Sequence, residues 1–300
     1  MSFFNNLIVS AVQLMPKPVV GFFSKKYIAG ENIEDAIKVT REFNNQGIYT
    51  TIDVLGESVK NKEEATVCMK DALGVLETIS TFNLKSNISI KPTQMGLAID
   101  EEFAYEQVRT IVQQAKVYNN FVRIDMEDSP YTDATFSLLK RLKQDYDNVG
   151  VVVQAYLKRT YDDVVVLNKV GTNYRLCKGI YVESPSIAYK DKEMIRKNYV
   201  QDLEIMLKNG NYVGIATHDE YLIKEAYRLI KELNIPKDKF EFQMLLGVRE
   251  DLRNKINNDG YKIRIYVPFG KDWYAYSTRR LKENPQMAGY VFKNLFTIGR

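Results

Sequence analysis

The sequence predicts an α/β protein whose main part is a (β/α)₈ barrel of the TIM type, preceded by a helical arm. Short β-branched runs alternate with longer amphipathic segments between about residues 48 and 270, which is typical of βα units around a parallel sheet. The chain of 300 residues is long enough, since such barrels occupy about 250 residues as one domain. A doubly wound sheet is the alternative, but no Gly-x-Gly-x-x-Gly follows the first run.

The strand candidates are apolar runs with the length of strands that are buried on both faces. In chain order they are residues 48–55, 88–91, 121–126, 149–156, 174–181, 212–217, 240–246 and 263–267. The charged segments between them have the apolar spacing of amphipathic helices. These are residues 63–81, 101–118, 134–145, 161–170, 190–208, 220–233 and 250–259. Helix stop signals agree with this division, because Gly210, Pro236 and Gly260 each precede a strand candidate.

Two parts are expected: residues 1–47 as an N-terminal helical arm and residues 48–300 as the barrel with C-terminal helices. The first 15 residues are apolar but interrupted by polar ones, and a span needs about 20 apolar residues. A basic opening and a cleavage site typical of a signal peptide are missing. The arm therefore either docks on the barrel or lies in a membrane interface.

Composition restricts the function. The formal charge is +4, from 42 basic and 38 acidic residues without blocks of one sign, which argues against nucleic acid as a partner. Two cysteines, Cys68 and Cys177, cannot form a disulfide framework and predict reduced thiols in a cytoplasmic protein. A single histidine, His218, argues against a zinc site, so we expect no metal.

Polar side chains share the faces of several predicted strands, since residues two apart point the same way. The sets are Ser89 with Lys91, Arg123 with Asp125, Gln243 with Leu245, Arg264 with Tyr266, and Arg175 with Cys177, Gly179 and Tyr181. Each residue alone could form a rim salt bridge or face a helix. Buried charges are normally paired or bind something, and active sites of this fold lie at the carboxyl ends of the strands. The pattern on five strands therefore predicts a ligand-filled barrel mouth.

The segment after the last strand carries a pair of arginines. Tyr276, Arg279, Arg280 and Glu283 are spaced to share one face of a helix. Adjacent guanidinium groups can bind a carboxylate through several charge-assisted hydrogen bonds. The alternative is a solvated helix face with an Arg–Glu pair.

Six segments resemble motifs of the proline dehydrogenase family, and they occur in the family's order. They are QAYLKR at 154–159, YRLCKGIY at 174–181, ATH at 216–218, FQMLLG at 242–247, RIYVPFG at 264–270 and YSTRRL at 276–281. The length is similar to that of the monofunctional bacterial enzymes. The resemblance implies a distorted barrel that binds FAD noncovalently, oxidises L-proline and passes electrons to a membrane quinone, with a possible peripheral membrane contact.

The resemblance also implies roles for single residues. Arg279, Arg280 and Lys91 would hold the carboxylate of proline, Asp125 would organise the site by pairing with Lys91, and Arg175 would lie near the reactive nitrogen of the flavin. Tyr181, Leu245, Tyr266 and Tyr276 would enclose the pyrrolidine ring. The FAD contacts would come from Arg123, Gln154, Arg175, Lys178, Gly179, Ile180, Thr217, His218 and Gln243.

Two positions depart from the family pattern: Ile180 stands where alanine is frequent, and Asp219 where asparagine often follows the histidine. His218 itself could instead be a catalytic base or a hydrogen-bonded core residue, and no residue is assigned as the base that accepts the amine proton.

Three other functions remain open at this point. One is a different flavin barrel similar to methylenetetrahydrofolate reductase. The second is an aldolase-type barrel in which Lys91 or Lys178 forms a Schiff base. The third is a barrel that binds a ligand without catalysis.

Overall fold

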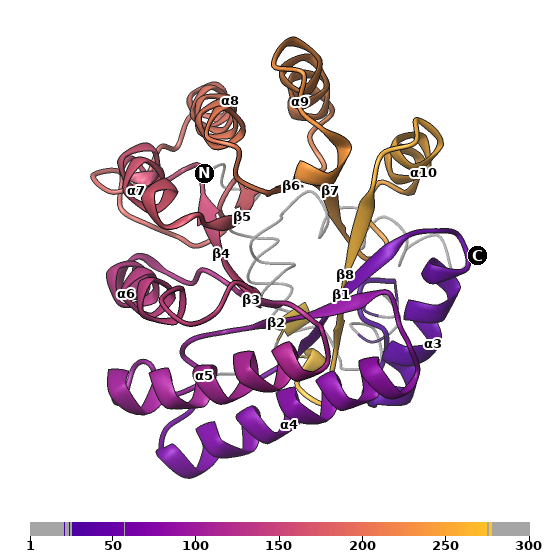
Figure 1. The fold of residues 1–300 in the computed structure, drawn as a ribbon, viewed down its shortest axis with the longest axis vertical. Helices are drawn as coiled ribbons and strands as arrows, with labels where there is room; N and C mark the ends of the chain where they lie inside the picture. The colour runs from indigo at the N-terminus through magenta and orange to yellow at the C-terminus, as the bar shows by residue number, and fades with distance from the viewer. Residues whose placement is uncertain (1–20, 22–23, 25, 57, 275, 278–300) are drawn as a thin grey trace, which may run out of the picture.

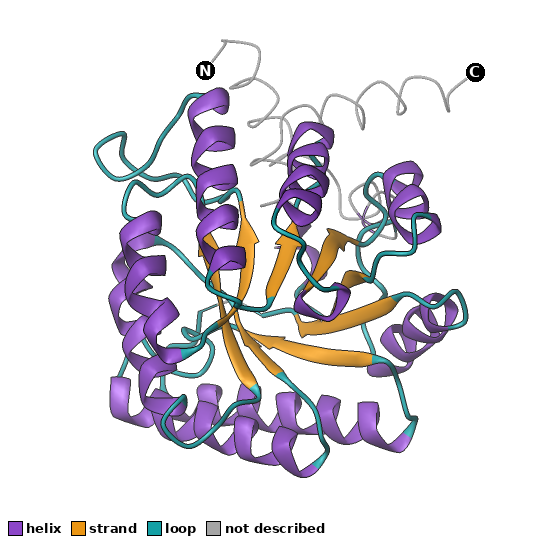
Figure 2. Ribbon diagram, turned by 45° about the horizontal axis from the view of Figure 1, so that its top comes forward, coloured by secondary structure: helices purple, strands orange, loops and turns teal. Residues whose placement is uncertain are grey.

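The computed structural model describes residues 21, 24, 26–56, 58–274 and 276–277. Within them, parallel strands β1 to β8 pair in chain order, and β8 pairs with β1 to close a barrel. The predicted (β/α)₈ fold is therefore confirmed, and Figures 1 and 2 show the helices around the strands. The strands are β1 (Tyr49–Val54), β2 (Ser86–Ile90), β3 (Val122–Ile124), β4 (Val149–Gln154), β5 (Asn173–Cys177), β6 (Val213–Ala216), β7 (Phe240–Leu245) and β8 (Ile263–Phe269).

The helices follow the strands as the alternation predicts. They are α4 (Lys62–Thr81), α5 (Glu101–Val117), α6 (Thr132–Leu142), α7 (Thr160–Leu167), α8 (Lys192–Lys208), α9 (Glu220–Glu232) and α10 (Glu250–Asn258). Short 3₁₀ turns η1 (Ser129–Tyr131), η2 (Asn168–Val170) and η3 (Lys237–Lys239) complete the connections. Several helices begin at a side-chain cap: Asn61, Asp100, Asp191 and Asp219 each accept a hydrogen bond from a backbone N–H of the first turn.

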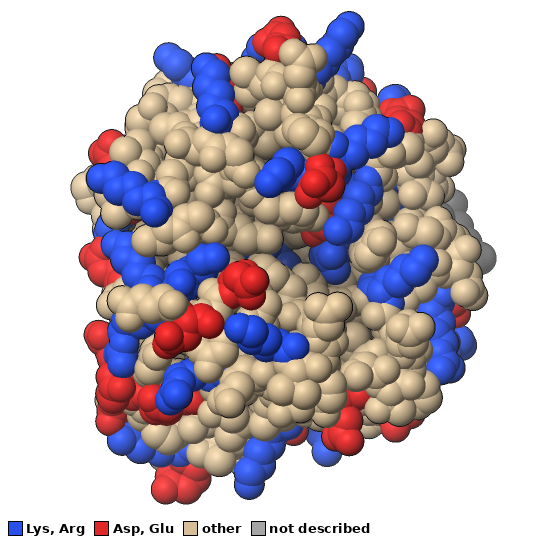
Figure 3. All heavy atoms as spheres, in the orientation of Figure 1, with Lys and Arg blue, Asp and Glu red and all other residues tan. Residues whose placement is uncertain are grey.

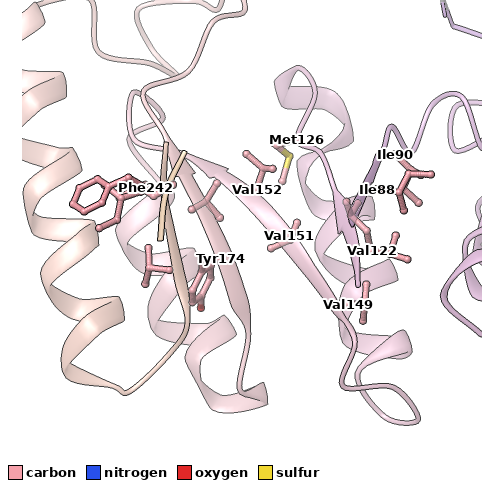
Figure 4. Close-up of a cluster of buried hydrophobic side chains, with 14 of the residues drawn as sticks. Ile88, Ile90, Val122, Met126, Val149, Val151, Val152, Tyr174 and Phe242 are labelled. Atoms are coloured by element: carbon pink, nitrogen blue, oxygen red, sulfur yellow. The ribbon is translucent and has the colours of Figure 1, made fainter. Parts of the chain in front are cut away.

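The strands have an apolar outer face, and most of them carry polar residues on the inner face. The outer residues pack between the strands and the helices, as Figure 4 shows for Val122, Val149 and Val151. The inner faces carry the polar residues that alternation predicted, and register places Ser89 beside Arg123 and Gln243 beside Arg264. The main hydrophobic core therefore lies between the strands and the surrounding helices, and the charged side chains lie inside the barrel.

Helix α3 (Ile33–Asn44) precedes β1 and packs against β1 and β8. In Figure 1 it takes the place in the ring between α10 and α4. Ala36, Ile37 and Phe43 are buried in the main core, and Thr40 accepts a hydrogen bond from the hydroxyl of Thr50 of β1 at 3.3 Å. This helix lies within the predicted arm and is part of the barrel wall; the boundary at residue 47 stays a prediction.

The predicted apolar segment of residues 1–15 lies outside the described residues. Among the helices that the structure describes, none has both the length and the apolar character to cross a bilayer. On the face seen in Figure 3, acidic and basic side chains are intermixed over the helices.

Candidate active site

A cavity of about 580 Å³ opens at the carboxyl ends of the strands. Its lining comes from strands, and from the loops that follow them, on most sides of the barrel. The lining residues are Lys91, Asp125, Met126, Val152, Gln154, Arg175, Cys177, Lys178, Gly179, Ile180, Tyr181, Ala216, Thr217, His218, Gln243, Met244, Leu245, Val248, Tyr266 and Tyr276. Most of the residues that the sequence suggested as site residues are therefore brought together here.

Arg175 and Asp125 form the central ion pair of the cavity. The Nη1 of Arg175 donates to Asp125 at 2.6 Å, and the hydroxyl of Tyr266 donates to the other carboxylate oxygen at 3.0 Å. The Nη2 of Arg175 reaches Ser89 at 3.1 Å, so its guanidinium is held from three strands. Burial and the Asp125 charge raise the pKa of Tyr266 well above its ordinary range, which keeps this phenol protonated.

The expected pair between Lys91 and Asp125 is wrong. The Nζ of Lys91 donates instead to both carboxylate oxygens of Asp53 on β1, at 2.7 and 2.8 Å. Asp125 is already engaged by Arg175 and Tyr266, so the lysine, which lies just beyond the end of β2, reaches Asp53. Burial lowers the pKa of Lys91, but the Asp53 and Asp125 carboxylates outweigh it and the net pKa is raised.

A buried polar layer supports the cavity from below. Gln243 accepts from the Nε of Arg175 at 2.6 Å and donates to Glu241 at 2.7 Å. Glu241 in turn accepts two hydrogen bonds from Arg264, at 2.5 and 3.1 Å. Burial raises the pKa of Glu241, but Arg264 and Lys262 outweigh it and lower it to about 2. A Cβ at Gly214 would collide with the Gln243 amide, so glycine makes room for it.

Arg123 belongs to this lower layer and does not line the cavity. It is 2% exposed, and its Nη1 donates to the carbonyl oxygens of Val151 and Asn173 at 3.1 and 2.6 Å. A Cβ at Gly150 would meet both Arg123 and the Asn173 carbonyl, so glycine again leaves the space. Arg123 is therefore not among the cavity-lining residues, and its expected FAD contact stays a prediction.

The loop after β5 crosses the mouth of the cavity. Lys178, Gly179, Ile180 and Tyr181 were expected to continue the strand, but β5 ends at Cys177 and Gly179 has a φ of 102°. A Cβ at Gly179 would collide with the Tyr156 ring, so the backbone approaches this ring closely. Residues 178–181, here called the strap, therefore line the cavity as a loop that crosses its mouth, and they do not share one face of a strand.

Asp219 joins the strap to two helices. Its carboxylate accepts from Arg196 of α8 at 2.8 and 3.0 Å and from Lys178 at 3.4 Å, and it caps α9. Burial raises the pKa of Asp219, but Arg196 and Lys178 outweigh it and the net pKa is lowered. The departure from the family's asparagine thus adds an ionised carboxylate beside Lys178.

His218 and Gln154 line the cavity from the ends of β6 and β4, which are separated by β5. The Nε2 of His218 accepts from the backbone N–H of Leu245 at 2.9 Å, so this nitrogen carries no proton and the ring ties β6 to β7. Gln154 is 3% exposed, and its Oε1 has no hydrogen-bond partner among the described residues. An unsatisfied acceptor in a cavity wall is suited to a ligand that donates a hydrogen bond.

Tyr276 lies in a helical turn that begins at Trp273, and it is buried against Leu55 and Ile28. Arg279, Arg280 and Glu283 of the predicted helix lie outside the described residues.

Sequence reasoning missed Asp53 and four apolar lining residues, Met126, Val152, Met244 and Val248. Asp53 could have been found, since it alternates with Thr51 along the first predicted strand and is the only acid in that run. The apolar residues carry no signal of their own that separates a cavity wall from a core.

A family model described as Proline dehydrogenase matches residues 36–292. Proline dehydrogenase 1 of Bacillus subtilis subsp. natto is 37% identical over 272 residues, which are 91% of this chain and 90% of that protein. Proline dehydrogenase of Deinococcus radiodurans is 36% identical over 277 residues, 91% of this chain and 89% of that protein. Proline utilization A from Bdellovibrio bacteriovorus, solved after inactivation by N-propargylglycine, has a TM-score of 0.81 at 25% identity, covering 87% of this chain and 32% of that one. The resemblance in the six motifs is confirmed: the chain belongs to the proline dehydrogenase family.

Proposed function

We propose that the chain oxidises L-proline to 1-pyrroline-5-carboxylate with FAD as its hydride acceptor, and that a membrane quinone takes the electrons. Its family, and the activity after which its relatives are named, support the substrate. The observation that carries the proposal is the cavity at the carboxyl ends of the strands, in which Lys91 and Arg175 face tyrosines and aliphatic side chains. Such a lining is suited to a small apolar ring with an anionic group.

The residues present fit a flavin. Gln154 offers an unsatisfied acceptor in the wall, and the backbone at Gly179 leaves the strap free of a side chain. The residues that would hold FAD are Gln154, Arg175, Lys178, Gly179, Ile180, Thr217, His218 and Gln243, all of them in the cavity lining. When bound there, FAD would supply the two-electron oxidant for the carbon–nitrogen bond of the ring.

The chain's own groups orient the substrate. Lys91, with Arg279 and Arg280, would bind the carboxylate. Fixing the carboxylate would hold the ring of proline close to the flavin. Tyr181, Leu245, Tyr266 and Tyr276 would pack around the ring. Asp125 would keep Arg175 in place through the 2.6 Å ion pair, so that a fixed positive charge stands where negative charge develops during the oxidation.

The Schiff-base alternative has less support. A nucleophilic lysine must be unprotonated, whereas Lys91 is paired with Asp53 and its pKa is raised. The Nζ of Lys178 donates to the Asp219 carboxylate at 3.4 Å, so this nitrogen is engaged in an ion pair.

The visible spectrum of the purified protein tests the proposal. We expect flavin absorption that bleaches on anaerobic addition of L-proline and stays unchanged with D-proline, because the carboxylate clamp fixes one face of the ring. Colourless protein that takes up no FAD contradicts the cofactor, and flavin that proline does not bleach contradicts the substrate.

The arginine pair is tested by Arg279→Met and Arg280→Met. Each variant should raise the KM for proline by at least tenfold, the loss of about 1.4 kcal/mol of binding, with a thermal midpoint close to that of the parent. Steady-state kinetics and a thermal melt measure both. Parental KM values in both variants would remove these residues from the clamp.

The quinone proposal includes a peripheral membrane contact through residues 1–15. Co-sedimentation with liposomes should fall when these residues are deleted. Equal pelleting of both proteins contradicts a contact through this segment.

A further inference from the structure

Asp53 is a buried carboxylate beneath the cavity that has no part in the proposed function. It is 1% exposed, and both of its oxygens accept from the Nζ of Lys91. In the described part of the chain it forms an ion pair with no other cation. A buried charge without a partner is strongly destabilising, so each of these two groups depends on the other.

The charges around Lys91 explain why this carboxylate matters. Asp53 faces it from β1, and Asp125 and Glu127 face it from the loop that follows β3, while Tyr266 of β8 lies beside Asp53. Asp125 bonds to Arg175 and Tyr266, and Glu127 accepts from the N–H and hydroxyl of Thr93 at 2.8 and 2.6 Å. Asp53 is therefore the one of the three carboxylates that bonds directly to Lys91.

The two cations of this group are paired one to one. Lys91 forms an ion pair with Asp53, and Arg175 forms one with Asp125. An ammonium group has three N–H donors, and the two oxygens of Asp53 engage two of them. The third can serve an incoming acceptor without any rearrangement of the lysine.

We infer that Asp53 is the positioning residue for Lys91: it holds the ammonium charged and in one place at the cavity wall, ready for the substrate carboxylate. The inference rests on the proposed function for the role of Lys91. A free lysine side chain would lose conformational entropy when it binds the substrate. The ion pair with Asp53 orders the side chain before the substrate arrives, so this loss does not weaken binding.

Competitive labelling of lysines with acetic anhydride, followed by mass spectrometry from about pH 6 to pH 10, tests the pairing in the purified protein. In Asp53→Asn, the Lys91 labelling curve should move down by at least one pH unit, so the labelling rate near pH 8 rises about tenfold. Asp100→Asn is the matched control. It breaks an exposed Lys–Asp pair of 2.6 Å and keeps a good helix cap, so the Lys91 curve should not move. An unchanged Lys91 curve in Asp53→Asn overturns the inference.

The KM for proline as a function of pH tests the consequence. In Asp53→Asn it should rise by about tenfold per pH unit above the lowered Lys91 pKa, while kcat changes less, because an uncharged amine binds a carboxylate poorly. In a Lys91→Met background the same substitution should add no pH dependence. A shifted labelling curve with a pH-independent KM would confirm the pairing and remove Lys91 from the proposed substrate site, so the two failures are distinguishable.

Asp53→Glu is a second variant that keeps the charge and moves it by one methylene. The Lys91 labelling rate should stay low, while the KM rises at every pH because the ammonium is displaced. A parental KM in this variant contradicts the positioning role even if Asp53→Asn does not fold.

Discussion

Asp202 is a buried carboxyl that has few hydrogen bonds to offset the cost of its burial. It is 0% exposed on α8, its Oδ1 has no partner among the described residues, and Asn198 donates to the other oxygen at a long 3.5 Å. Burial raises its pKa from 3.8 to about 8. A carboxyl that is protonated when folded and ionised when unfolded makes the protein less stable as the pH rises between these two values.

Asp202→Asn should therefore stabilise the protein, with a gain that grows from acidic to weakly alkaline pH and reaches about 1–3 kcal/mol. Urea unfolding at about pH 5 and pH 8 measures it. Glu204→Gln on the same helix removes an exposed pair with Lys208 and should change stability little at either pH. A gain in stability that is equal at both pH values would show that the ionisation of Asp202 is not its cause.

At the scale of an element, the strap after β5 depends on a backbone that only glycine adopts easily. Gly179 has a φ of 102° and lies against the Tyr156 ring. Further along, Glu183 accepts from the N–H and hydroxyl of Ser129 at 2.6 and 2.8 Å, which fastens the strap to the loop after β3. The strap is thus fixed at both ends, and its four cavity residues move together.

Gly179→Ala should cost about 1–3 kcal/mol and lower the affinity for FAD, because both the φ and the Tyr156 contact resist a Cβ. Flavin content after dialysis and a thermal melt measure the two effects. Gly171→Ala is the matched control: its φ is 60°, and a Cβ there meets nothing within 4 Å. Equal losses in both variants would show that the backbone conformation alone, and not the Tyr156 contact, decides the cost.

The elements also show where sequence reasoning stops. Alternation correctly placed Ser89, Arg175 and Gln243 inside the barrel, since strand geometry fixes that face. It failed beyond Cys177, where the positive φ of Gly179 ends the alternation. The family resemblance, in turn, implied the wrong partner for Lys91. Asp53 lies on β1 and Asp125 directly after β3, on the two sides of β2, and the contacts of Asp125 with Arg175 and Tyr266 decide between them.

At the scale of the whole molecule, the barrel closes with help from a helix that precedes its first strand. Eight βα units could be counted from the sequence, but the place of α3 against β1 and β8 could not, because its partners are far away along the chain. Phe43 of this helix is 7% exposed, and the Arg253 guanidinium of α10 lies 5.2 Å from the centroid of its ring.

Phe43→Ala should therefore destabilise the entire protein by about 3–5 kcal/mol in one unfolding transition. Phe82→Ala is the matched control, since this ring is 45% exposed and its loss should cost about 1 kcal/mol or less. Urea unfolding followed by circular dichroism compares them. A separate early transition in Phe43→Ala would mean that α3 can detach while the barrel stays folded.

The filled lower half of the barrel has a kinetic consequence. Arg123, Glu241 and Arg264 are each at most 7% exposed and occupy the space below the cavity, so this end is sealed by side chains. Under the proposed function, proline and the quinone cannot then enter from opposite ends of the barrel, and we expect both to enter at the carboxyl ends of the strands, one after the other. With proline and a quinone varied together, such alternation gives parallel double-reciprocal plots, whereas intersecting lines would require both molecules to be bound at once.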